Sequence, residues 1–195
     1  MRNATVSVLV ALLLGSSALL SQASQPLRLT PDSLGPLRLG SKAMVSVPIL
    51  ERAFPRYRVT HDICQGDSPD FHCFVVATTE GEKLFVIQSF LKDGRSAVGS
   101  DGRQEVPIDL IQVISRQVPD RFGLRVGDRV ADVLRIRGDK LAFGAGHHNV
   151  VLGSDSIFYS FATGSQSSPT RFTLADVKRA NWRIVSISWP HGAWE

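Results

Sequence analysis

The sequence has only two cysteines and no run of more than two like charges. It has one notable apolar run, near the amino terminus, and none of similar length elsewhere. Its longest apolar run, residues 6–14, is followed by Gly15, Ser16 and Ser17, and it is much shorter than the roughly 20 apolar residues that cross a bilayer. The sequence therefore predicts no transmembrane segment. The mildly basic composition, with no long run of basic residues, is not the footprint of a nucleic-acid-binding protein.

Motifs of common catalytic sites are missing as well. No Cys-x-x-Cys pair is present for redox chemistry. Residues 144–146 (Gly-Ala-Gly) lack the third glycine and the long helix of a dinucleotide-binding loop. Residues 164–167 lack the closing glycine of a serine-nucleophile elbow. The sequence thus predicts no catalytic residue, no cofactor and no metal.

The amino terminus has the pattern of a secretory leader. Arg2 gives a positive start, residues 6–14 form a short apolar core, and Ser21 and Ala23 place small side chains at the −3 and −1 positions of a cleavage site. We predict a signal peptide over residues 1–23 and a periplasmic or secreted protein. A bacterial lipoprotein carries cysteine as its first mature residue, whereas the first cysteine here is Cys64, so we expect no lipid anchor.

The mature chain, residues 24–195, has the size and composition of one folded domain. Removal of the leader takes away one base and no acid, which leaves 21 Lys+Arg against 18 Asp+Glu. This mildly basic balance permits weak attraction to anionic polymers of the cell envelope. With 43% hydrophobic and 21% charged residues, the chain has enough apolar side chains to bury a core.

Two cysteines in an exported chain predict a disulfide, Cys64–Cys73. Residues 66–70 between them have strong turn composition. The flanking segments, residues 57–63 and 71–78, have the composition and patterning of strands. The bond is therefore expected to close one end of a hairpin.

The alternative for the same region is a metal site formed by the two cysteines together with His61 and His72. Thiolate and imidazole are zinc ligands, although the spacing differs from that of the usual zinc fingers. The oxidising compartment favours the disulfide.

Turn spacing in the first half predicts one helix and an antiparallel meander. Ser46 is a suitable helix cap, Pro48 suits the first turn, and Pro55 ends the helix. About four strands then follow between residues 57 and 115, separated by turns.

Past Pro119 the pattern of the amino-terminal part recurs. Residues 123–127 (Gly-Leu-Arg-Val-Gly) repeat residues 35–40 (Gly-Pro-Leu-Arg-Leu-Gly), and each segment precedes a predicted short helix. The second helix is expected near residues 128–136, with Asp128 as its cap. Either the chain contains a duplicated strand–turn–helix unit, or generic turn sequences recur by chance.

The last part of the chain predicts three more strands, a helix capped by Thr173 and a final strand. In the final strand, residues 182–189, Val185, Ile187 and Trp189 share one face, and Trp189 is expected in the core. The predicted fold class is therefore α+β: a single domain with a mainly antiparallel sheet and two or three short helices.

Several segments match a known pattern in order and spacing over nearly all of the mature chain. They are Leu34-Gly35-Pro36, residues 53–59 (Ala-Phe-Pro-Arg-Tyr-Arg-Val), residues 123–128, residues 157–161, Ala175-Asp176-Val177, Asn181-Trp182 and Ile187-Ser188-Trp189. Together they resemble the RpoE-regulated lipoprotein family, bacterial envelope proteins that carry a domain of unknown function (DUF1131). The resemblance implies an α+β fold and a role associated with envelope stress, and it supplies no catalytic residue. The chain departs from the family in lacking the lipid-bearing cysteine and in the placement of its cysteine pair.

Five side chains are candidates for contact with a ligand or partner: Arg56, Arg58, His147, His148 and Trp194. The two arginines lie on the outward face of a predicted strand and are placed to meet an acidic partner; the alternative is a solvated face. Adjacent histidines point to opposite sides of an extended chain, so they share a metal only from a loop that adds a distant carboxylate. Trp194 is expected to be an exposed ring in the tail.

These observations predict an exported envelope protein that binds an unidentified protein, glycan or small ligand and has no enzymatic activity. Two alternatives stay open. One is a periplasmic hydrolase that acts on cell-wall material. The other is an immunity or inhibitor protein that inserts a loop, residues 144–149 or 163–170, into the cleft of a partner.

Overall fold

Eight antiparallel strands form the central sheet, in the order β4-β5-β6-β8-β12-β11-β10-β9. The computed structural model describes residues 26–65, 70–91, 101–138, 141–145, 150–162 and 172–190. The sheet consists of β4 (Arg58–Cys64), β5 (Phe71–Ala77), β6 (Lys83–Phe90), β8 (Leu110–Val113), β9 (Ala142–Ala145), β10 (Val150–Ser154), β11 (Ile157–Phe161) and β12 (Ile184–Trp189). Two short pairs accompany it: β1 (Ser33–Leu34) with β2 (Leu37–Arg38), and β3 (Met44–Val45) with β7 (Val106–Pro107).

The predicted meander is confirmed, because β4, β5, β6 and β8 are consecutive neighbours in the sheet. The edge strand β4 shows why the pattern could be seen in the sequence. Val59 and Ile63 are half-buried, whereas Arg58, Thr60 and Asp62 are exposed, so one side of this strand faces the protein and the other faces water.

Three short helices complete the fold class that the sequence predicts. They are α1 (Val47–Ala53), α2 (Val130–Arg137) and α3 (Leu174–Ala180). Thr173 caps α3 as expected: its hydroxyl accepts from the Asp176 N–H at 3.3 Å, and the Asp176 carboxylate accepts from the Thr173 N–H at 2.9 Å. The cap predicted at Asp128 is one residue early, because Arg129 occupies the N-cap of α2. Asp128 instead closes the preceding turn by accepting from the Arg125 N–H at 2.9 Å.

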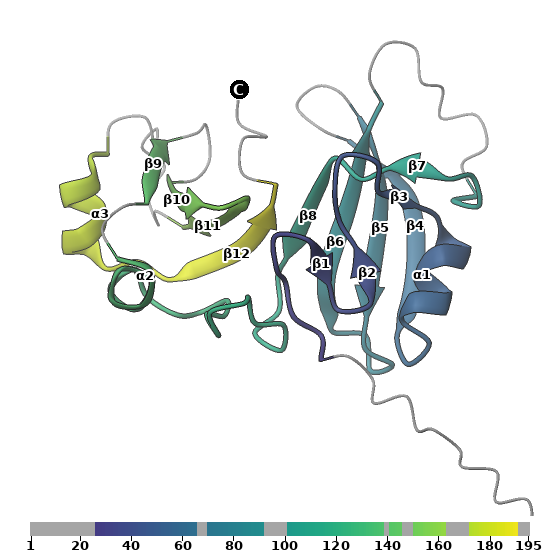
Figure 1. The fold of residues 1–195 in the computed structure, drawn as a ribbon, viewed down its shortest axis with the longest axis horizontal. Coiled ribbons are helices and arrows are strands. Elements are labelled where there is room, and N and C mark those ends of the chain that lie inside the picture. Colours follow the sequence, from purple (N-terminus) through teal and green to yellow (C-terminus); the bar gives the residue numbers. More distant parts are fainter. Residues whose placement is uncertain are drawn as a thin grey trace, which may run out of the picture.

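All three helices pack on one side of the sheet, which we call the helix face. Their buried side chains join a single apolar cluster with one set of alternating strand residues. From the helices the cluster receives Leu50, Val130, Val133 and Val177. The other set of strand residues points to the opposite side, the second face, and its apolar members Val151 and Phe158 lie outside that cluster. Figure 1 shows the sheet turning between β8 and β12, with α1 beside one half and α2 and α3 beside the other.

The strand order has an internal symmetry. The first half runs α1, β4, β5, β6 and then β8, and the second half runs α2, β9, β10, β11 and then β12. In the sheet β8 and β12 are central neighbours, and β4 and β9 are the two edges. A two-fold axis between the central strands therefore exchanges the two halves in topology.

The sequence before each helix supports the same relation. Residues 31–35 (Pro-Asp-Ser-Leu-Gly) match residues 119–123 (Pro-Asp-Arg-Phe-Gly), and Leu-Arg-Leu-Gly at residues 37–40 matches Leu-Arg-Val-Gly at residues 124–127. Both turns use a positive φ at glycine, +54° at Gly35 and +85° at Gly123, a conformation that glycine adopts without a Cβ penalty. The shared topology and the extended match favour duplication over chance recurrence.

The predicted face of the last strand needs one correction. Ile187 and Trp189 are buried, and the Trp189 indole N–H donates to the Pro31 carbonyl at 2.8 Å, but Val185 is 39% exposed. The pairing of β11 with β12 shifts register between Ser160 and Phe161. This irregularity turns Ile184 toward the core in place of Val185.

Candidate functional site

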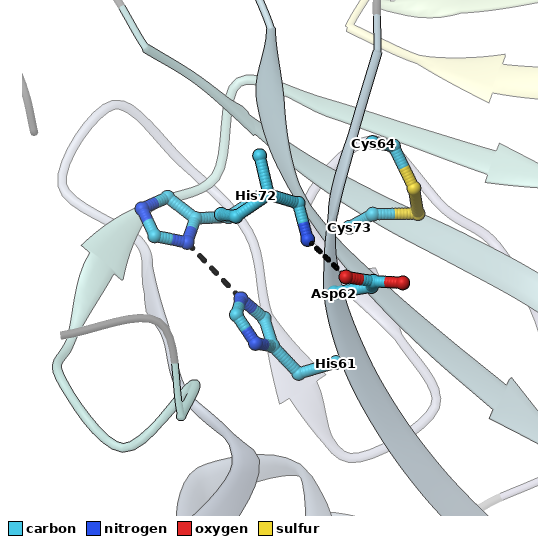
Figure 2. The surroundings of a disulfide bond; sticks show 6 residues. His61, Asp62, Cys64, His72 and Cys73 are labelled. Atoms are coloured by element: carbon cyan, nitrogen blue, oxygen red, sulfur yellow. Dashed lines mark hydrogen bonds between the residues drawn. A yellow bond between two sulfur atoms is a disulfide. The ribbon is translucent and has the colours of Figure 1, made fainter. Parts of the chain in front are cut away.

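The disulfide between Cys64 and Cys73 joins the ends of β4 and β5, as the sequence predicts (Figure 2). The two Cα atoms are 5.7 Å apart, a typical separation for bonded cysteines. In the register of the hairpin, Cys73 lies opposite Asp62 and Cys64 lies opposite Phe71. The bond therefore crosses the second face of the sheet, close to the turn.

Two histidines lie on the other face of the same hairpin. The Nε2 atom of His61 and the Nδ1 atom of His72 are 3.0 Å apart, as Figure 2 shows. The four-ligand metal site considered for this region is not assembled, because the sulfurs are bonded to each other and lie across the sheet from the imidazoles. Within the described ranges, no cluster of three or more potential ligands could hold a metal ion.

The histidine pair is tightly enclosed. The His61 ring packs against Phe74 with a centroid distance of 4.6 Å. Gly102 lies directly over it: a Cβ atom added there would be 2.5 Å from the His61 Cγ atom. The Gly102 carbonyl accepts from the Val47 N–H at 2.8 Å, which ties this contact to the start of α1. Burial, and then the charge of His61, hold the pKa of His72 below its usual value.

The second face carries a row of small buried polar side chains near the centre of the sheet. Ser160, Ser186 and Ser188 are each at most 3% exposed. The Gln112 amide donates to the Ser186 hydroxyl at 3.2 Å, so the row continues from β12 onto β8. The sequence pattern does not indicate this row, because β11 and most of β12 are buried on both sides and show no clean alternation.

A second polar group, not identified from the sequence, is buried on the helix face. The Tyr159 hydroxyl donates to Asp120 at 2.6 Å and accepts from the Arg137 guanidinium at 2.8 Å. Arg137 also donates to the Ser154 hydroxyl and lies 3.4 Å from Asp155. The Asp120 and Tyr159 residues are fully buried, and the Arg137 side chain is 2% exposed.

Asp120 also organises the turn that precedes α2. Its second carboxylate oxygen accepts from the N–H groups of Phe122 and Leu124, each at 2.9 Å. Burial raises the pKa of Asp120, and the hydrogen bonds from Tyr159 and the two amides act in the opposite direction. Burial, followed by the nearby Asp120 charge, raises the pKa of Tyr159. With no exposed reactive atom, Asp120 and Tyr159 join the turn to β11 and are not placed to meet a substrate.

Phe122 covers the outer side of this buried network. The Arg137 guanidinium lies 4.4 Å from the Phe122 ring centroid, and the Arg121 guanidinium lies 4.5 Å from it. The ring is 36% exposed, and Arg121 pairs with Asp155 at 2.9 Å. A cation over the ring face favours this arrangement electrostatically.

The candidate contact residues fall in different places. Arg58 begins β4 and Arg56 lies in the turn before it; both are exposed. The sequence predicts both arginines on one strand, whereas β4 begins at Arg58 and leaves Arg56 in the preceding turn. His147, His148 and Trp194 lie outside the described residues.

The described residues contain no helix long and apolar enough to cross a membrane. No family model matches the sequence, and no curated protein matches it. Among solved structures, the chain is similar to the crystal structure of the uncharacterized protein yfeY from Escherichia coli, with a TM-score of 0.58 and 18% sequence identity. The match covers 84% of this chain and 99% of that one. The similarity shows that this chain shares its fold with a bacterial protein.

Proposed function

We propose that this protein is exported to the periplasm or secreted, that residues 1–23 are removed as a signal peptide, and that the mature domain is a binding module of the bacterial envelope with no enzymatic activity. The sequence resemblance to the RpoE-regulated lipoprotein family supports a role associated with envelope stress. The fold shared with a bacterial protein is consistent with this origin.

The disulfide is the observation that carries the proposal. Cys64 and Cys73 form a bond at the end of the hairpin, and the described residues include no free cysteine. Disulfides form and persist in oxidising compartments and are rare in the cytosol. The leader pattern at residues 1–23 supplies the route to such a compartment. A cysteine engaged in a disulfide carries no thioether-linked lipid, which supports an unanchored mature chain.

Cell fractionation with intact-mass analysis tests the compartment. We expect a chain that begins at Ser24, is recovered from the periplasm or medium, and gains the mass of two hydrogen atoms on reduction. A matched Cys64→Ser and Cys73→Ser variant should show no mass change on reduction. A chain that still begins at Met1 and has two free thiols in the cytosol would contradict the proposal.

Chemical cross-linking in intact cells tests the binding role. We propose that Arg56 and Arg58, together with His147, His148 and Trp194, contact the partner. Replacing the two arginines by Gln should reduce capture of an envelope component, while Arg103→Gln, a similarly exposed arginine, serves as the control. Release of soluble cell-wall fragments by the purified protein would instead support the hydrolase alternative.

A further inference from the structure

Four arginines surround one turn at the base of α2, and we call them the arginine cluster (Arg116, Arg125, Arg129 and Arg183). The Arg183 guanidinium donates to the Gly127 carbonyl at 2.8 Å, and the Arg116 guanidinium donates to the Val126 carbonyl at 3.1 Å. Arg116 also lies 3.0 Å from the Asp128 carboxylate. The turn at residues 126–128 is therefore held between two guanidinium groups.

The remaining two members are anchored in the same way. Arg125 donates to the Arg116 carbonyl at 2.8 Å, and Arg129 donates to the Asn181 carbonyl at 3.3 Å. A backbone bridge between Arg129 and Arg183 places these two side by side. In the described chain these anchoring bonds use one terminal nitrogen, Nη1, of each guanidinium. A guanidinium has five N–H donors, so each fixed side chain keeps further donors for an external anion.

The cluster is exposed and carries net positive charge. The Arg116 side chain is 64% exposed, and Arg129 and Arg183 are exposed as well. Two acids lie among them: Asp128 pairs with Arg116, and Asp132 pairs at 2.9 Å with a fifth arginine, Arg135. Five positive charges thus face two negative ones. Because backbone carbonyls already fix the arginines, ordering them for a ligand costs less conformational entropy than ordering free side chains.

The cluster lies at the end of the domain where the described chain begins. The Leu29 N–H donates to the Pro119 carbonyl at 2.9 Å, and Leu29 forms a parallel bridge with Asp120. In Figure 1 the start of the described chain and the segment between β8 and α2 occupy the same lower side of the molecule. Because residues 1–23 are removed in the proposed mature chain, the arginine cluster itself, and not the leader, supplies the attraction to a bilayer.

We propose that the arginine cluster is a docking surface for a bilayer that contains anionic phospholipid, whose phosphate groups accept hydrogen bonds from the outward guanidinium donors. This inference deepens the proposed binding role and rests on export of the chain. Each basic side chain near an anionic leaflet contributes to attraction that falls off within a Debye length. Several fixed arginines on one surface therefore give binding that depends steeply on salt and on lipid charge.

Vesicle sedimentation tests this surface on the chain purified from the compartment in which fractionation finds it. The probe is phosphatidylcholine vesicles with about 30 mol% phosphatidylglycerol, compared with pure phosphatidylcholine. We expect binding to the anionic vesicles alone, at least tenfold weaker at about 0.3 M than at about 0.05 M salt. Arg129→Gln with Arg183→Gln should weaken binding by roughly tenfold or more, whereas Arg129→Lys with Arg183→Lys should retain most of it.

The matched control is Arg52→Gln with Arg103→Gln, which removes the same charge from exposed positions in the first half of the domain. This control should change binding less than threefold, and thermal unfolding should show that all variants are folded. Equal weakening by the control and the cluster variant would overturn the proposal, as would no binding to anionic vesicles at low salt. Binding to a soluble phosphate-bearing polymer without binding to vesicles would also overturn it. An exported chain that fails the vesicle assay refutes this inference and leaves the proposed compartment intact.

Discussion

Removing one oxygen atom from the buried network, by Tyr159→Phe, tests whether that network stabilises the second half of the domain. The hydroxyl donates to Asp120 at 2.6 Å and accepts from Arg137 at 2.8 Å. Without it, a carboxylate oxygen and a guanidinium N–H lose their partner in a buried setting. Each unsatisfied buried group costs about 1–3 kcal/mol, so we expect a loss of about 3 kcal/mol in the free energy of unfolding. For a chain of this size, the melting temperature falls by about 6–12 °C.

The size of this loss should depend on pH. Burial raises the pKa of Asp120 above its ordinary value of 3.8, so between the two values the folded state binds more protons than the unfolded state. The favourable contribution of the protonated Asp120 is present below this window and is lost as the pH rises through the folded pKa. The hydrogen bond from Tyr159 lowers the Asp120 pKa. Its removal raises that pKa further, so Tyr159→Phe costs less stability in acid than at neutral pH.

Denaturant unfolding followed by tryptophan fluorescence, at about pH 4.5 and about pH 7.5, measures both effects. Tyr57→Phe is the matched control, because Tyr57 is the other tyrosine of the chain and is half-buried against the edge of Phe54. We expect this control to change the free energy of unfolding by less than about 0.5 kcal/mol. A loss below about 1 kcal/mol for Tyr159→Phe at both pH values, or equal losses for the two variants, would refute the reasoning.

Three further predictions concern the hairpin and its surroundings. Reducing the Cys64–Cys73 bond, which closes a segment with a sequence separation of 9, should lower the free energy of unfolding by about 2–3 kcal/mol, and denaturation curves that coincide with and without reductant would contradict this. Gly102→Ala places a Cβ atom 2.5 Å from the His61 Cγ atom at a φ of +68°. It should lower the free energy of unfolding by at least about 1 kcal/mol more than Gly81→Ala, because Gly81 has a φ of +96° but open space around it. The folded protein holds the pKa of His72 below 6.5, so the unfolded state takes up the proton first and stability falls as the pH drops below about 6.5. An NMR titration of His72 with a midpoint above 6.5, or an unchanged acid profile in His72→Gln, would count against this.

Local patterns predicted those elements in which one side faces water. The exposed Arg58, Thr60 and Asp62 alternate with half-buried residues in β4, so both the strand and its orientation could be predicted. The strands β10 and β11 are among the three that the sequence predicts before the Thr173 cap, but β11 is buried on both faces. In such a strand the alternation of apolar and polar residues disappears. In the neighbouring strand β12, a register shift decides that Ile184 and not Val185 is buried, and such a shift has no local signature in the sequence.

The candidate sites likewise divide into those with a local signal in the sequence and those without one. The disulfide followed from the compartment and from the short turn between two strands, which are local properties of the sequence. Asp120 and Tyr159 are separated by 39 residues, and Arg183 reaches a carbonyl 56 residues away. These contacts arise only when the second half folds around its turn. The one local signal in the sequence is the Pro-Asp pair, which occurs in both copies of the motif. The environments of its two aspartates can therefore be compared directly.

That comparison shows how the second copy of the Pro-Asp motif differs from the first. The Asp32 side chain is exposed, and a hydrogen bond from the Thr30 hydroxyl at 2.7 Å holds its pKa low. The equivalent Asp120 is buried, which raises its pKa, and it accepts a hydrogen bond from the Tyr159 hydroxyl on β11. The matching strand of the first half, β6, presents Phe85 and Ile87 to the helix face beside β8, and neither side chain has a hydrogen-bond donor.

The turn at residues 120–124 is therefore fixed to the sheet by a buried bond, and it leads directly into the turn at residues 126–128 that the arginines surround. Asp120→Asn should loosen these turns and weaken binding to anionic vesicles several-fold below the melting temperature, although it removes a negative charge that would otherwise repel them. Asp32→Asn removes the same charge from the exposed copy and should leave binding equal or slightly stronger. If both variants strengthened binding alike, net charge alone would govern the attraction, and the buried Tyr159–Asp120 bond would have no part in positioning the cluster.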